Sequence, residues 1–120
     1  MANIHKYLKI AVIITSLCCF IAGCRRHDYR TITIDVPGMK NQKCVEIVTQ
    51  AIVNELMRCM AFEPDKKIEV DMTRRTVTVT YDSLKLSVKN IEFAIAKAGF
   101  TANDVPADPS AYEKLPPECK

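Results

Sequence analysis

Hydrophobic and polar residues alternate with strand-like and helix-like periods through most of the chain. In TITIDV (31–36) every second residue is apolar, which predicts a strand with one buried face. From about residue 43 to 58 the apolar positions recur at helical spacing, and Asn41 is a suitable N-cap for that helix. Two more alternating stretches, IEVDM (68–72) and TVTVTY (76–81), are joined by a short polar segment and predict a β-hairpin.

A second helix and a short last strand complete the predicted order. Residues 84–98 place apolar side chains on one stripe, Ser87 is a candidate N-cap, and Gly99 stands where a helix often ends in glycine. FTANDV (100–105) then predicts a short strand. The order β-α-β-β-α-β predicts an α+β fold of the ferredoxin-like type, with a four-stranded antiparallel sheet and two helices on one face. The remaining segment, 106–120, is a Pro-rich tail that we expect to be extended, with at most one helical turn.

The N-terminus has the composition of a targeting segment. A short basic stretch precedes an apolar run that is too short for a comfortable membrane span. The run ends in IAGC (21–24), which resembles the lipobox of bacterial lipoproteins and implies acylation at Cys24. We therefore expect a lipoprotein signal peptide over 1–23, a polar tether over 24–30, and a protein anchored to a bacterial membrane in the cell envelope, on the periplasmic or outer-surface side. An ordinary cleaved signal and an uncleaved anchor are the alternatives.

Charge and composition exclude several function classes. The formal net charge is +3, and Lys6 and Lys9 of the targeting segment account for two of these charges. No basic cluster lies beside base-stacking aromatic residues and the chain has no Trp, which argues against nucleic-acid binding. His5 and His27 lie outside the predicted domain, we expect His27 to be solvated, and no catalytic constellation is present. The sequence therefore does not predict an enzyme.

Several motifs in a fixed order resemble a heavy-metal-associated domain, the fold of copper chaperones and of the N-terminal domains of metal-pumping ATPases. Gly38 and Met39 precede the first predicted helix, Cys44 stands at its start, and IEFAIAKAGF leads to Phe100. The resemblance covers about residues 30–105, and we expect the domain itself over 31–105. It implies that Met39 points inward and that Phe100 lies near a metal-binding loop.

The loop departs from the pattern of that family at one position. The family's loop reads G-M-x-C-x-x-C, and this chain has Asn41 where the first cysteine belongs. Thiolate ligands select soft ions such as Cu(I) and Zn(II), and a helix N-terminus favours the thiolate form. Cys44 alone would give a weak site. Its place in the first helical turn predicts a partly exposed, reactive thiol.

A second thiol for the loop has to come from elsewhere in the chain. Cys59 lies about 22 Å from Cys44 along the predicted helix, which is too far for a shared site. Cys119 follows a Pro-Pro pair in the tail, and fifteen extended residues reach about 50 Å, so the tail can return to the loop. Cys44 and Cys119 are therefore the predicted metal ligands. The alternative is a disordered tail with a free or intermolecular thiol.

The leading hypothesis is a membrane-tethered binder of a soft metal ion, with Cu(I) as the first choice and Zn(II) as another, acting in envelope metal trafficking or detoxification. Its expected partners are the membrane, through the lipid anchor, and a metal transporter or another metal-binding protein. Two other hypotheses remain open. One is an interaction module that has kept the fold and lost metal binding; the other is a thiol-redox sensor based on Cys44 and Cys119.

Overall fold

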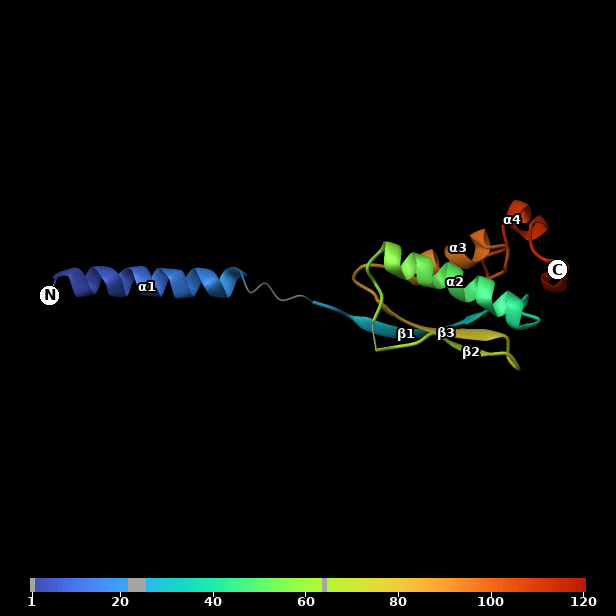
Figure 1. Ribbon diagram of the computed structural model, residues 1–120, viewed down its shortest axis with the longest axis horizontal. Helices are drawn as coiled ribbons and strands as arrows, with labels where there is room; N and C mark the ends of the chain where they lie inside the picture. Colours follow the sequence, from blue (N-terminus) through green and yellow to red (C-terminus); the bar gives the residue numbers. More distant parts are fainter. Residues whose placement is uncertain (1, 22–25, 64) are drawn as a thin grey trace.

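A computed structural model describes residues 2–21, 26–63 and 65–120 of the chain. Figure 1 shows a long N-terminal helix at one end and a small layered domain at the other. Cys24 and the predicted acylation boundary lie outside the described residues. Within the described part of the chain, no helix is both long enough and apolar enough to cross a bilayer. The elements, in order, are α1 (Ala2–Ile21), β1 (Tyr29–Asp35), α2 (Gln42–Arg58), β2 (Glu69–Asp71), β3 (Thr76–Asp82), α3 (Val88–Lys97), α4 (Pro109–Glu113) and the 3₁₀ turn η1 (Pro117–Cys119).

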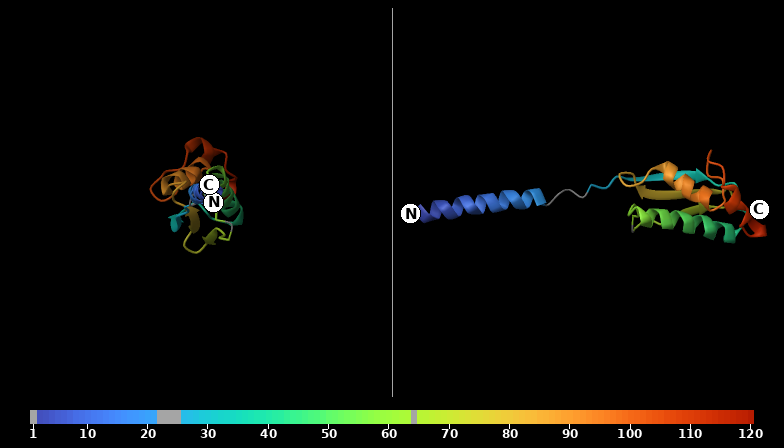
Figure 2. Two further views of the ribbon diagram at one scale, coloured as in Figure 1. Left: turned by 90° about the vertical axis from the view of Figure 1, so that its left-hand side faces the viewer. Right: turned by 90° about the horizontal axis from the view of Figure 1, so that it is seen from above.

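The sheet is antiparallel and has the strand order β1-β3-β2. Strand β1 pairs with β3 along its whole length, from Tyr29 opposite Asp82 to Asp35 opposite Thr76. Helices α2 and α3 lie on one side of this sheet, as predicted, and Figure 2 shows them running side by side. The alternation seen in the sequence sets these two faces. Threonine pairs on the outer face bond across the strands, whereas the inner face joins the helices in one core that includes Ile34, Val36, Val48, Ile52, Leu56, Val77, Val79, Ile91 and Ile95.

The predicted fourth strand is not present in the described residues, where the sheet has three strands. Residues 100–105 instead form a tight turn in which Ala102 and Val105 bond to each other. Asn103, at φ 50°, attaches this turn to the end of β1 through two hydrogen bonds with the Asp35 backbone, of 2.8 and 2.9 Å. The left-handed backbone of Asn103 turns the chain away from β1. Pro106 follows shortly after and has no N–H to donate, so the hydrogen-bond ladder with β1 does not continue beyond Asn103.

The capping residues that the sequence predicted are confirmed in both core helices. The side chain of Asn41 caps α2 and that of Ser87 caps α3. Gly99 follows α3 with φ 102°, a conformation that favours glycine. Helix α3 starts at Val88, later than the predicted residue 84, because Asp82 first forms a turn by accepting a hydrogen bond from the Leu84 backbone.

His27 does not point freely into solvent as expected. Its Nδ1 lies 2.8 Å from Oδ2 of Asp82, a carboxylate that is only 1% exposed. The backbone N–H groups of Asp28 and Leu84 donate to the other oxygen of Asp82. The hydrogen bond from His27, together with these backbone bonds, lowers the pKa of Asp82 despite its burial. The segment before β1 is therefore fixed to the domain from His27 onward.

Candidate metal centre

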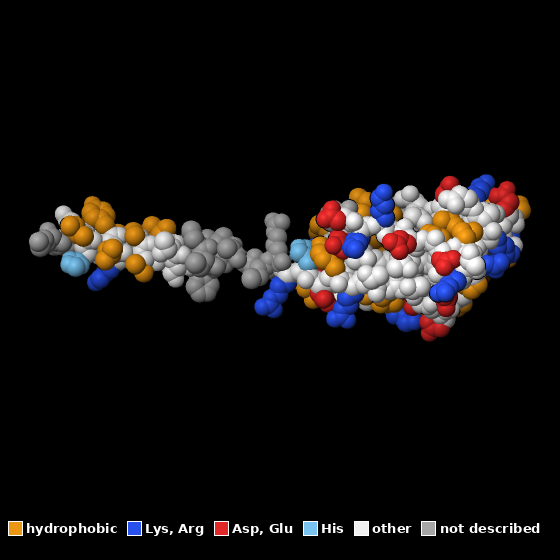
Figure 3. Space-filling view, turned by 90° about the horizontal axis from the view of Figure 1, so that it is seen from below, with side chains coloured by type: hydrophobic (Ala, Val, Ile, Leu, Met, Phe, Trp, Pro, Cys, Tyr) orange, Lys and Arg blue, Asp and Glu red, His pale blue; other side chains and the backbone are white. Residues whose placement is uncertain are grey.

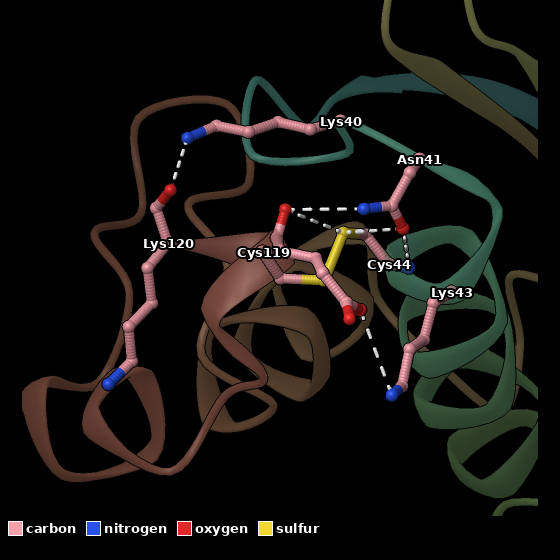
Figure 4. The surroundings of a disulfide bond; sticks show 7 residues. Lys40, Asn41, Lys43, Cys44, Cys119 and Lys120 are labelled. Carbon is pink, nitrogen blue, oxygen red and sulfur yellow. Dashed lines mark hydrogen bonds and ion pairs between the residues drawn. A yellow bond between two sulfur atoms is a disulfide. The ribbon is translucent and has the colours of Figure 1, made fainter.

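The structure joins the two predicted ligand cysteines directly. Cys44, in the first turn of α2, and Cys119, in η1, form a disulfide with a Cα–Cα distance of 5.7 Å across a sequence separation of 75 residues (Figure 4). Cys59 is a free thiol at the other end of α2 and takes no part in this pair. The centre is thus a pair of sulfur atoms that two distant parts of the chain supply.

The tail reaches Cys44 by folding onto the domain, so the expectation of an extended tail is wrong, whereas the one helical turn expected in it is present as α4. Asp108 caps the short helix α4 and its backbone N–H donates to Ala96 of α3. Leu115 is buried against Gly99, where an added Cβ would lie only 3.0 Å from the Leu115 side chain. These contacts hold the tail independently of the disulfide, because none of them involves either cysteine.

Asn41 connects the loop, the helix and the tail (Figure 4). Its Oδ1 accepts a hydrogen bond of 3.1 Å from the backbone N–H of Cys44, which is the capping bond that the sequence predicted. Its Nδ2 donates to the carbonyl of Glu118, the residue before Cys119, at 3.2 Å. The second bond was not predicted. The only signal for it in the sequence is that an amide at a cap position, unlike a serine, has N–H groups left to donate.

A second pair of contacts, both from lysines, also ties the loop to the tail. The ammonium group of Lys40 donates to the carbonyl of Lys120, and that of Lys43 lies 3.7 Å from a carboxylate oxygen of Glu118. Because Lys43 and Glu118 are each more than half exposed, their ion pair adds little stability. It does connect the first turn of α2 to the residue before Cys119.

Both cysteines of the disulfide are buried. Cys44 is 0% exposed and Cys119 is 2% exposed, so the expectation of a partly exposed Cys44 is wrong for this state. The physical reason is that the docked tail covers the helix start. Met39 is also fully buried, and Gly38 lies so close to Phe100 that an added Cβ would come within 2.9 Å of its ring. Phe100 therefore packs directly under the loop.

The arrangement is suited to a soft ion with a low coordination number. A thiolate at Cys44 would lie at the N-terminus of a 17-residue helix with no acidic residue in its first turn, which favours the charged form. Among residues 2–21, 26–63 and 65–120, no three His, Cys, Asp or Glu side chains are grouped as a metal site. Two sulfur ligands are what this centre offers.

Comparisons with known proteins agree with this fold. The chain is 32% identical over 74 residues to the mercuric transport protein periplasmic component of Pseudomonas aeruginosa, covering 62% of this chain and 74% of that protein. The protein of the same description from Shigella flexneri is 31% identical over the same lengths. No family model matches the chain.

Solved structures extend the likeness to three dimensions. The crystal structure of oxidized MerP from Ralstonia metallidurans CH34 superimposes with a TM-score of 0.53 at 30% identity, over 63% of this chain and 96% of that one. A copper-binding domain of a P-type ATPase gives a TM-score of 0.51 at 26% identity, over 62% and 90%. The chain therefore belongs to the family of mercuric transport protein periplasmic components, and its domain is a heavy-metal-associated domain.

Proposed function

We propose that this protein binds and carries a soft metal ion in the bacterial envelope, holding the ion between the thiolates of Cys44 and Cys119. The observation that carries the proposal is the disulfide itself, which places Cys119 beside Cys44 at the helix start. The loop position that holds a cysteine in related metal-binding domains is Asn41 here. Cys119 supplies the second sulfur from the tail instead.

Metal binding requires reduction of the disulfide. A dithiol reductant supplies two electrons and two protons, the S–S bond breaks, and each cysteine becomes a thiol while the reductant becomes a disulfide. Binding of the ion then displaces the two thiol protons. With metal–sulfur bonds of about 2.3 Å each, the two sulfur atoms move apart to at most about 4.6 Å. The tail contacts through Asn41 and Leu115 keep Cys119 near Cys44 during this change.

The ligand count favours ions that accept two thiolates. Hg(II) and Cu(I) do so, whereas Zn(II) in structural sites takes four ligands. Relatives of this chain are described as mercuric transport proteins, and a structural neighbour is described as copper-binding. We therefore propose Hg(II) or Cu(I) as the cargo, ahead of Zn(II). The receiver of the ion would be a metal transporter or another metal-binding protein.

The envelope location and the membrane tether are part of the same proposal. The apolar N-terminal run and the IAGC boundary support a lipid attached at Cys24. Relatives described as periplasmic support export. Replacing Cys24 with Ser should abolish incorporation of labelled fatty acid into the protein, and equal labelling of both forms would contradict lipidation.

The metal site is tested by titrating the reduced full chain with Cu(I) and Hg(II) against a competing chelator, followed by native mass spectrometry. Cys44→Ser and Cys119→Ser should each reduce affinity by at least tenfold, and the double variant should lose little more because the two sulfurs act as one site. Cys59→Ser is the matched control and should bind as wild type does. Unchanged affinity in Cys119→Ser would contradict the tail as a ligand.

A rescue experiment tests whether a second sulfur at the loop suffices for binding, whichever residue supplies it. Asn41→Cys in the Cys119→Ser background rebuilds the two-cysteine loop of the family and should restore Cu(I) and Hg(II) binding.

The disulfide also favours a second candidate function, a thiol-redox sensor. If the reduced wild type binds neither ion and the disulfide re-forms readily, the sensor replaces the metal carrier. If neither property is found, the interaction module remains.

A further inference from the structure

The end of the domain opposite the disulfide exposes a group of apolar side chains. Met60 is 75% exposed, Leu84 60%, Tyr29 40% and Phe62 39%. We name these four residues the tether-end patch. They come from the start of β1, the segment after α2 and the turn after β3, and none belongs to the metal centre. Isolated exposed apolar residues are ordinary, but a group at one end of a domain calls for an explanation.

Backbone contacts show that the tether-end patch is one region. Tyr29 is paired with Asp82 in the sheet, and Phe62 forms a bridge with Tyr81. The backbone N–H of Asp82 donates to Ala61 between Met60 and Phe62, and the Lys85 ammonium donates to the Met60 carbonyl at 3.0 Å. The segments that carry the four side chains therefore meet around the end of β3.

Exposed basic side chains surround this region. Arg58 precedes Met60 with 67% of its side chain exposed, Arg30 follows Tyr29 with 66%, and Lys85 follows Leu84 with 36%. Each of these cations also has an acidic neighbour: Arg30 is paired with the half-exposed Asp28, Arg58 with the largely buried Glu55, and Lys85 with the buried Asp82. Figure 3 shows hydrophobic, basic and acidic side chains together at the end of the domain that is nearer the N-terminal helix. Apolar side chains with basic neighbours complement an anionic lipid surface.

The chain path places a membrane at this same end. His27 is fixed to the domain by Asp82, and six residue steps separate it from Ile21, the last residue of α1. Six steps span about 20 Å at most, and the three steps from a lipid on Cys24 span about 10 Å. A bilayer that holds the N-terminal segment therefore lies within reach of the tether-end patch. The C-terminus, where Cys119 forms the disulfide, lies at the opposite end of the domain (Figure 1).

We propose that the tether-end patch rests on the anionic bilayer surface, so that the domain stands with its metal centre directed away from the membrane. This inference rests on the proposed membrane tether, but it is independent of metal binding. The apolar side chains enter the interface between headgroups and acyl chains, and Arg30, Arg58 and Lys85 face lipid phosphates. A docked domain would present Cys44 and Cys119 in one orientation to a partner, whereas a freely tethered domain would present them in all orientations.

The absence of tryptophan from the chain allows a direct test. Leu84→Trp places a single fluorophore in the patch. Tyr112→Trp is the matched control, because Tyr112 is 39% exposed in α4 at the disulfide end. The full chain of each variant is bound to vesicles of phosphatidylglycerol and phosphatidylcholine with brominated acyl chains. We expect bromine to quench at least half of the Leu84→Trp emission, with a blue shift, and to leave Tyr112→Trp emission unchanged.

Second substitutions show whether the patch is responsible. Met60→Asp in the Leu84→Trp background should remove the quenching, because a carboxylate is repelled from anionic lipid. Phe93→Asp, at an equally apolar residue that is 52% exposed on α3, should leave it in place. Vesicles of phosphatidylcholine alone should give weaker quenching. Equal emission from Leu84→Trp and Tyr112→Trp would overturn the docking.

Co-sedimentation with the vesicles separates the possible failures. If the full chain sediments with vesicles but the Leu84→Trp emission is not quenched, the tether stands and the docking is wrong. If the chain does not sediment with vesicles, both the tether and the docking are wrong. A blue shift that depends on protein concentration and not on lipid would assign the patch to a second copy of the chain. Metal titration of the same variants should match wild type in every case.

Discussion

Reduction of the Cys44–Cys119 disulfide should lower the free energy of unfolding without unfolding the domain. The bond closes a loop of 75 residues, which includes most of the sheet and both core helices. In the chain-entropy model, a loop of this length restricts the unfolded chain enough to contribute about 4.5 kcal/mol at 25 °C. This value is an upper limit, because measured effects of disulfides commonly fall between about 2 and 4 kcal/mol.

The reduced domain should nevertheless stay folded, because its core does not depend on the bond. The inner faces of β1, β3, α2 and α3 are closed by apolar side chains, and the tail has its own contacts through Leu115 and Asn41. For a domain of this size, about 2 to 4 kcal/mol corresponds to a fall in Tm of at least about 8 °C. A metal chelator added to the reduced protein should cause no further loss of far-UV circular dichroism.

The assay is urea unfolding followed by circular dichroism, with and without a phosphine reductant. The Cys44→Ser/Cys119→Ser double variant is the control, and its unfolding midpoint should not respond to the reductant. Cys59→Ser should respond as wild type does, because Cys59 is outside the bond. If wild type unfolds at the same urea concentration with and without reductant, the loop-closure reasoning is wrong for this chain. Loss of the fold on reduction would show that the disulfide, and not the apolar core, holds the domain together.

Three other substitutions test single contacts. Asn41→Ala removes the cap of α2 and the bond to Glu118, and should cost about 1 to 2 kcal/mol in urea unfolding. Gly99→Ala places a Cβ 3.0 Å from the Ala111 backbone at φ 102°, so it should destabilise the domain by at least about 1 kcal/mol and speed amide exchange in the tail. Asp82→Asn should destabilise the domain at pH 7. The pKa of Asp82 is lowered by folding, so its contribution is present above the unfolded pKa and is lost as pH falls through the lower folded pKa. The difference between Asp82→Asn and wild type should therefore shrink below about pH 4, in urea unfolding at both pH values.

The strands and helices of the core were predictable because each has a simple period and a clear boundary. Alternation in β1 and β3 decided which side chains face inward, and the caps Asn41 and Ser87 fixed the starts of the helices. The last strand was not predictable in the same way. Residues 100–105 are too short a segment for an alternating pattern to identify a strand reliably. The left-handed backbone of Asn103 ends the extended conformation, and the sequence does not show that turn directly.

The candidate site was predictable in its sulfur atoms and not in its surroundings. Tail length allowed Cys119 to reach Cys44, and the structure joins them. The sequence did not predict the burial of Cys44. The position of a residue within a helix does not show whether a segment 75 residues further along the chain will cover it. The binding of His27 to Asp82 was missed for a similar reason. A lone histidine in a polar segment carries no sign of a buried carboxylate that lies 55 residues further along the chain.

A site divided between a loop and a tail behaves differently from a loop with two cysteines. In a two-cysteine loop the local backbone alone fixes the separation of the sulfurs. Here the effective concentration of the Cys119 thiol at Cys44 depends on how firmly the tail is docked through Asn41 and Leu115. Tail docking and ion binding are thermodynamically linked. The free energy by which docking strengthens ion binding equals the free energy by which a bound ion would stabilise docking. In the proposed site, Asn41 would contribute through its side-chain amide, which donates to the carbonyl of Glu118 next to Cys119, whereas a cysteine at position 41 would supply the sulfur itself.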